Sequence, residues 1–199
     1  MTQGPAMDRR DVLKLGGAAS LTLLAPAAVA VAARASSPTP STIVVADPRY
    51  RESLVFAGSL ERQGARVVTL ASDRAGTWFS AVAPQLPRGL RSLAGLTLES
   101  DLFILGRLAE SSGARTCYSG RHDWRCRQAV GHTLSGSIDL DPIATALVNA
   151  REEWAEGLGG ALLAAKDGRR EEQRLQLECA LPSGRGPRFF VSWLMRWAV

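Results

Sequence analysis

The sequence predicts an α/β fold: a three-layer, mostly parallel sheet of the Rossmann-like or flavodoxin-like kind that ends in a C-terminal β-hairpin. Three observations support this prediction. Short β-branched runs alternate with amphipathic helical segments along the chain. The first strand-like runs are apolar along their whole length, as a sheet covered on both faces requires. A turn-rich segment separates the last two strand-like runs, which is typical of a hairpin.

The first predicted elements form a strand, helix, strand unit. Residues 42–46 are a β-branched run, residues 50–63 place apolar side chains on one helical face, and residues 66–71 form a second strand. Gly64 follows the helix and ends it. This order predicts two parallel strands joined by a crossover helix.

The same alternation continues through the middle of the chain. We expect a helix, a short strand, a strongly apolar helix and a fourth strand over residues 76–86, 94–97, 100–111 and 114–119. A polar segment, residues 118–127, follows that strand, and we expect it to be a loop because it is rich in charged residues.

The C-terminal part is predicted to contain one strand, one long helix and the hairpin. Residues 132–137 form the strand, and the helix runs from 141 to about 166, with Asp141 as its N-cap and a proline at its first position. Residues 172–180 and 188–197 are strand-like and are joined by a segment rich in proline and glycine.

The first 35 residues have the three parts of an export signal: a basic start, an uncharged run over residues 15–33, and the small-residue site Ala33-Arg34-Ala35. The basic part resembles a twin-arginine (Tat) signal, Ser/Thr-Arg-Arg-x-Phe-Leu-Lys, in the order Asp8-Arg9-Arg10-Asp11-Val12-Leu13-Lys14. Asp8 stands where the hydroxyl residue is usual, and Val12 stands where Phe is usual. The resemblance implies that the Tat translocase exports the folded protein to the periplasm.

We expect cleavage after Ala35, a linker over residues 36–41 and a single domain over residues 42–199. The mature protein would then have no stable membrane span. In the alternative, residues 15–33 are not cleaved and anchor the protein in the membrane, since about 20 apolar residues span a bilayer. The glycines, the hydroxyl residues and the proline of this run favour cleavage.

The net charge of the whole chain is +5, and removal of residues 1–35 lowers it to +3. A surplus this small, without a dense run of Lys or Arg, argues against binding to nucleic acid. The first strand is not followed by G-x-G-x-x-G, so a dinucleotide site of that type is not expected either. No cofactor is identified by any motif.

Four side chains follow predicted strands and are candidates for binding a ligand: Asp47, Asp73, Ser100 and Asp101. Ligands of doubly wound sheets bind beyond the carboxyl ends of the strands, where these residues are expected to meet. The other interpretation is that they cap helices and form turns, as Asp and Ser often do at such positions.

The segment from Cys117 to His132 contains both histidines and two of the three cysteines of the chain. Cys117, His122, Cys126 and His132 are possible metal ligands. In an oxidising compartment, a disulfide between Cys117 and Cys126 is the simpler expectation and ranks above a metal site.

The same segment carries Arg121, His122 and Trp124, which could bind an anionic small molecule or a glycan. Three functions stay open. We favour a non-catalytic periplasmic protein that binds a small ligand or serves an exported partner enzyme. The alternatives are a small hydrolase or lyase that uses Asp47, Asp73 and His122, and a carrier of metal or electrons that uses the cysteines and histidines.

Overall fold

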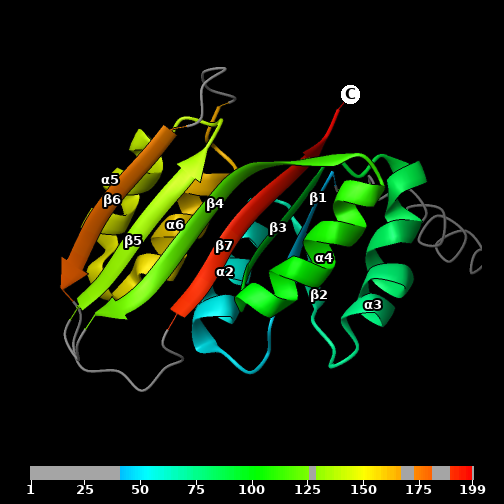
Figure 1. The fold of residues 1–199 in the computed structure, drawn as a ribbon, viewed down its shortest axis with the longest axis horizontal. Coiled ribbons are helices and arrows are strands. Elements are labelled where there is room, and N and C mark those ends of the chain that lie inside the picture. The colour runs from blue at the N-terminus through cyan, green and yellow to red at the C-terminus, as the bar shows by residue number, and fades with distance from the viewer. Residues whose placement is uncertain (1–40, 126–128, 167–172, 181–188, 199) are drawn as a thin grey trace, which may run out of the picture. The chain divides into compact units, whose positions relative to one another are not determined.

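The computed structural model describes residues 41–125, 129–166, 173–180 and 189–198, which form a seven-stranded mixed sheet with helices packed against it (Figure 1). The strand order is β2-β1-β3-β7-β4-β5-β6. The predicted α/β class is therefore confirmed. The expectation of a mostly parallel sheet is wrong, because only one end of the sheet is parallel.

The parallel end contains the strand, helix, strand unit predicted from the sequence. Strand β1 (Thr42–Ala46) pairs in parallel with β2 (Arg66–Thr69) on one side and with β3 (Ser92–Thr97) on the other. Helix α2 (Arg51–Glu61) connects β1 to β2. Ile43, Val44 and Val45 of β1 are fully buried, because helices of the two faces cover both sides of this strand.

The connection from β2 to β3 is helical but irregular. It consists of α3 (Arg74–Thr77), a π-helical turn (η1, Trp78–Val82) and a 3₁₀ segment (η2, Ala83–Arg88). Pro87 lies inside the 3₁₀ segment, and a proline there removes a hydrogen-bond donor that a continuous α-helix would need. The single helix predicted over residues 76–86 is thus three short segments.

The remaining strands are antiparallel. Helix α4 (Glu99–Ser111) leads into β4 (Ala114–Arg125), which pairs with β5 (Ala129–Gly136). Strand β5 pairs in turn with β6 (Gln173–Ala180). The polar loop expected at residues 118–127 is wrong for its described part, since β4 continues to Arg125.

The predicted C-terminal hairpin is also wrong. Strand β7 (Phe189–Trp197) lies between β3 and β4, whereas β6 lies at the edge of the sheet against β5. Burial explains the separation. Six consecutive residues of β7 are buried, as a strand covered on both faces requires, whereas the described side chains of β6 alternate between half-buried and exposed.

The long helix expected at residues 141–166 is divided into α5 (Asp141–Ala150), a 3₁₀ turn (η3, Arg151–Glu153) and α6 (Trp154–Leu162). The break falls at Arg151, whose φ is +46°, outside the helical region. Asp141 is the first helical residue and not the N-cap, a position that Leu140 occupies.

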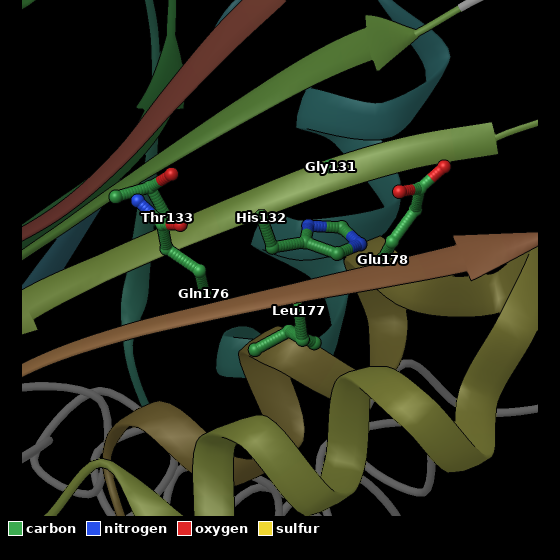
Figure 2. A pocket seen from close by; sticks show the side chains of 6 residues that line it. All are labelled: Gly131, His132, Thr133, Gln176, Leu177 and Glu178. Atoms are coloured by element: carbon green, nitrogen blue, oxygen red, sulfur yellow. The ribbon is translucent and has the colours of Figure 1, made fainter.

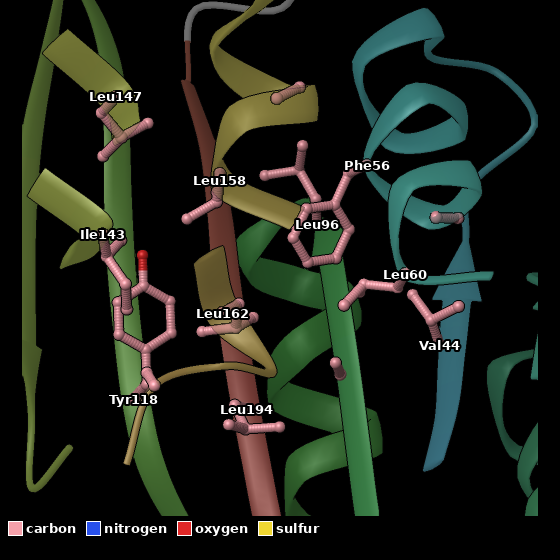
Figure 3. Close-up of a cluster of buried hydrophobic side chains, with 14 of the residues drawn as sticks. Val44, Phe56, Leu60, Leu96, Tyr118, Ile143, Leu147, Leu158, Leu162 and Leu194 are labelled. Atoms are coloured by element: carbon pink, nitrogen blue, oxygen red, sulfur yellow. The ribbon is translucent and has the colours of Figure 1, made fainter. Parts of the chain in front are cut away.

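Two apolar clusters pack against the two faces of the sheet. One joins the sheet to α2, α5 and α6, and Figure 3 shows part of it. The other joins the sheet to α4 and to the segment around η1. In Figure 1, α5 and α6 lie behind β4, β5 and β6, and no helix of the described residues lies in front of these strands. The front of β4, β5 and β6 is therefore open to solvent.

Candidate functional site

The open side of β4, β5 and β6 carries three cross-strand rows of polar residues, which we call the open face. The pairing registers give the rows as Ser119, Ser135 and Arg174; Arg121, Thr133 and Gln176; and Asp123, Gly131 and Glu178. Successive rows are two residues apart along each strand, so these side chains point to one side of the sheet. The apolar and histidine residues between them point to the helices.

A depression of about 430 Å³ lies over the first two rows. Its lining consists of the side chains Ser119, Arg121, Thr133, Ser135 and Arg174. Two guanidinium groups and three hydroxyl groups thus face one space, and none of the described lining residues is a carboxylate. The volume is in the range of 300–1,000 Å³ that small-molecule sites occupy.

Arg121 is held in place at one side of this depression. Its Nε donates to both carboxylate oxygens of Asp123, each at 3.2 Å, and its guanidinium carbon lies 5.0 Å from the centre of the Phe189 ring. Stacking and pairing of this kind fix the plane of an arginine. The two terminal NH₂ groups have no hydrogen-bond partner among the described residues, so they are available to a ligand.

A second, smaller depression of about 220 Å³ adjoins the first (Figure 2). Its lining comes from β5 and β6 and consists of Gly131, His132, Thr133, Gln176, Leu177 and Glu178. Thr133 belongs to both linings, so the two depressions are neighbours on the sheet. The described lining of the smaller depression includes a carboxylate, whereas the described lining of the larger one consists of cationic and hydroxyl groups.

A network of buried polar side chains lies on the other side of the same strands. His122 Nδ1 and His132 Nδ1 are 2.6 Å apart, and His122 Nε2 is 2.7 Å from Ser192 Oγ, which lies 3.0 Å from the Tyr118 hydroxyl. Trp154 of α6 covers both imidazoles, with ring centroids 4.7 and 5.4 Å away. We call these residues the histidine network.

Burial keeps the histidine network uncharged. It lowers the pKa of His132 to about 4 and, together with the neighbouring His132, lowers the pKa of His122 well below its ordinary value. Burial also raises the pKa of Tyr118. The order Ser192, His122, His132 resembles that of a nucleophile, a base and an orienting group. All three are at most 1% exposed, and of the three His132 alone is part of the lining of a depression.

A cluster of charged residues lies at the carboxyl ends of β1 and β3, on either side of the point where the strand order reverses. Arg49 NH2 lies 2.6 Å from Asp47 Oδ2 and 3.5 Å from Asp101 Oδ2, and Arg74 Nε donates to Asp101 Oδ1 at 2.7 Å. Both carboxylates are buried. Burial raises the pKa of Asp47, but the hydrogen bonds from Arg49 and the positive charges of Arg49 and Arg74 together lower it, so the net direction is downward.

The structure brings only some of the predicted site residues together. Asp47 and Asp101 meet through Arg49, as members of the charged cluster. Asp73 caps α3 by accepting a backbone N–H at 2.9 Å, and Ser100 is exposed in the first turn of α4. His122 belongs to the histidine network. The three residues predicted for a hydrolase or lyase, Asp47, Asp73 and His122, thus make three separate sets of contacts.

No disulfide is found within the described residues, so the predicted bond between Cys117 and Cys126 is not confirmed. Cys117 lies in β4, which extends to Arg125. The Cys117 Sγ instead lies 3.6 Å from the Arg115 carbonyl oxygen. Cys126 itself lies outside the described residues.

Of the proposed metal ligands, the two histidines meet and Cys117 does not join them. No group of three or more potential metal ligands occurs within the described residues. The signal residues Arg9 and Arg10 lie outside the described ranges, and so does the side chain of Trp124, although its backbone belongs to β4.

Sequence reasoning missed the partners that neighbouring strands supply. Arg174 and Glu178 reach the open face through the pairing of β5 with β6, and Ser192 reaches His122 through the pairing of β4 with β7. The alternation of polar and apolar residues in β6 was a usable signal, since it places Arg174, Gln176 and Glu178 on one side.

Comparison of the chain with protein-family models, with curated proteins and with solved structures finds no match in any of the three. Among the described residues, no helix is long and apolar enough to span a membrane. The geometry of the open face is therefore the basis for assigning a function.

Proposed function

We propose that this protein is a non-catalytic, exported binding protein that holds a small anionic molecule on its open face, between Arg121 and Arg174. One observation carries the proposal: among the described residues, a depression of about 430 Å³ is lined by two arginines and three hydroxyl residues and by no carboxylate. Guanidinium groups bind phosphate, sulfate or carboxylate through paired hydrogen bonds, and hydroxyl groups complete the coordination of the remaining oxygens.

The rigid strands that carry these side chains favour a binding site over a solvated surface. All five lining residues lie on strands that pair with one another, and sites on strands keep their geometry better than sites on loops. Asp123 and Phe189 fix the Arg121 guanidinium before any ligand arrives. Less conformational entropy is then lost on binding.

The rest of the proposal concerns location and partners. The first 35 residues support Tat-dependent export to the periplasm, with the Tat translocase as partner, followed by cleavage; an uncleaved membrane anchor is the alternative. The parallel order β2-β1-β3 supports a flavodoxin-like arrangement for that end of the sheet. This site is compatible with a protein that delivers its ligand to an exported partner enzyme.

The test is calorimetric titration of the purified protein with inorganic phosphate, sulfate, citrate and glucose 6-phosphate in a buffer of low ionic strength. We expect at least one anion to bind and Arg174→Gln to weaken that binding about tenfold, since a hydrogen bond to a charged group contributes about 1.5–3 kcal/mol. Arg115→Gln is the control, because Arg115 is an exposed arginine of β4 outside the depression. Absence of binding, or equal loss in both variants, would overturn the proposal.

A further inference from the structure

The charges of the open face are separated along the strands. The arginines occupy the first two rows, with Arg174 in one and Arg121 in the next, whereas both carboxylates, Asp123 and Glu178, occupy the third. Between these two carboxylates lies Gly131, which has no side chain. The face is therefore positive at one end and negative at the other.

The negative end has a space of its own. The depression of about 220 Å³ is lined in part by Gly131 and Glu178, and Figure 2 shows the Glu178 side chain among those that line it. Asp123 already accepts from Arg121, but Glu178 is exposed and has no ion-pair partner among the described residues. Glu178 is thus the carboxylate available to a ligand.

The two linings share Thr133, so a molecule that lies over this residue can extend toward both spaces. Two residues along a strand span about 7 Å and four residues about 13 Å. The backbone of β6 therefore separates Glu178 from Arg174 by about 13 Å, and both side chains are long enough to lean toward a ligand between them. A molecule with charged groups roughly 7–13 Å apart matches this spacing.

We infer that the ligand of the open face is zwitterionic, with its anionic group at Arg121 and Arg174 and an ammonium group at Glu178. This inference rests on the proposed function, because it adds an ammonium subsite to the anion site. An amino sugar phosphate or a short ω-amino acid has this chemistry. The ammonium contact is exposed, so it contributes selectivity between ligands more than affinity.

The test compares two matched pairs of ligands by calorimetry at low ionic strength: glucosamine 6-phosphate with glucose 6-phosphate, and 6-aminohexanoate with hexanoate. Within at least one pair we expect the amine to bind three- to tenfold more tightly. Glu178→Gln should abolish that ratio while leaving the affinity for the ligand without the amine unchanged or slightly higher. Glu61→Gln, at an exposed acid of α2, is the control and should preserve the ratio.

The outcomes separate the two proposals. If no phosphate or carboxylate binds, the anion site itself is refuted. If the anions bind but the amine gives no advantage in either pair, the anion site stands and the ammonium subsite is refuted. An amine advantage that persists in the Glu178→Gln protein also refutes the assignment of Glu178.

Discussion

The charged cluster and the histidine network bury ionisable groups in opposite ways. In the charged cluster, Asp47 and Asp101 are at most 2% exposed and keep partners of opposite charge in Arg49 and Arg74. In the histidine network, the imidazoles have no charged partner among the described residues, and burial holds them neutral. The stability of the charged cluster therefore depends on its arginine partners. The stability of the histidine network depends on the pH, because its imidazoles must stay unprotonated.

This difference predicts two windows of acid sensitivity. A lowered carboxyl pKa, as at Asp47, contributes stability that is lost only as the pH falls below the ordinary value of 3.8. A histidine that is neutral in the folded state and protonated in the unfolded state costs stability as soon as the pH falls below 6.5. As the pH falls, the stability contributed by the histidine network should therefore be lost before that contributed by the charged cluster.

The largest expected effect is this loss of stability in mild acid. Between pH 6.5 and 4, the unfolded chain binds protons that the folded chain excludes, so the free energy of unfolding falls as the pH falls. For His132, whose pKa is about 4, the loss approaches roughly 3 kcal/mol at the lower limit. Urea unfolding at pH 7, 5.5 and 4.5 measures it.

The control for this effect uses the fact that the chain has two histidines in all. A His122→Gln, His132→Gln variant should lose the dependence of stability on pH between 6.5 and 4.5, even if it is less stable overall. Nuclear magnetic resonance of the imidazole protons gives an independent reading. Histidines that titrate near pH 6.5 in the folded protein would contradict the expected burial of a neutral pair.

A smaller loss of stability is expected when one member of the charged cluster is replaced. Arg74→Leu leaves the Asp101 carboxylate buried, with Arg49 3.5 Å away as its remaining partner, and should lower the free energy of unfolding by about 2 kcal/mol. Asp101→Asn removes the buried charge itself and should cost about half as much, because both arginines can reach water.

Urea unfolding at pH 7 compares the two variants, with Arg107→Leu as a control. Arg107 is an exposed arginine of α4 whose only ion pair among the described residues is with Glu110, so its replacement should change stability by less than about 0.5 kcal/mol. If Asp101→Asn lowered the free energy of unfolding more than Arg74→Leu, the expectation would be contradicted. The arginines, and not the carboxylate, would then be the groups that most need a partner.

The smallest effect is expected at the edge of the histidine network. Tyr118→Phe keeps the ring in the apolar cluster but removes the hydroxyl that bonds to Ser192, and should cost about 1 kcal/mol. Tyr50→Phe is the matched control, because the other tyrosine of the chain contributes its ring edge to Phe190. Equal losses in thermal unfolding of the two variants would show that the hydroxyl of Tyr118 contributes nothing specific.

The parallel end of the fold was predictable because its signals are local. The run at residues 42–46, the helix that follows it and the strand at residues 66–71 each show their period within a few residues. The antiparallel end was harder because the place of β7 depends on pairing between residues far apart in the sequence. Consecutive strands often pair with each other, and that tendency suggested the hairpin that β6 and β7 do not form.

In the candidate site, too, residues with local signals were predictable from the sequence, whereas those that depend on strand pairing were not. Arg121 was identified from the sequence because its neighbours are charged and aromatic, and Asp47 and Asp101 were identified because they follow strands. Arg174 and Glu178 belong to a strand that was assigned to the wrong neighbour, so their approach to Arg121 could not be foreseen. A loop over residues 118–127 would let two cysteines approach each other, but the described part of this segment, up to Arg125, is extended strand.

Gly120 lies where the histidine network is most crowded. A Cβ atom at this position would come within 2.3 Å of the Tyr118 hydroxyl and 2.6 Å of Ser192 Oγ. A larger residue at this position would therefore push the Tyr118 hydroxyl and Ser192 Oγ apart and break the hydrogen bond between them. The missing side chain of Gly120 is thus what lets the tyrosine, the serine and the histidine close into one chain of hydrogen bonds.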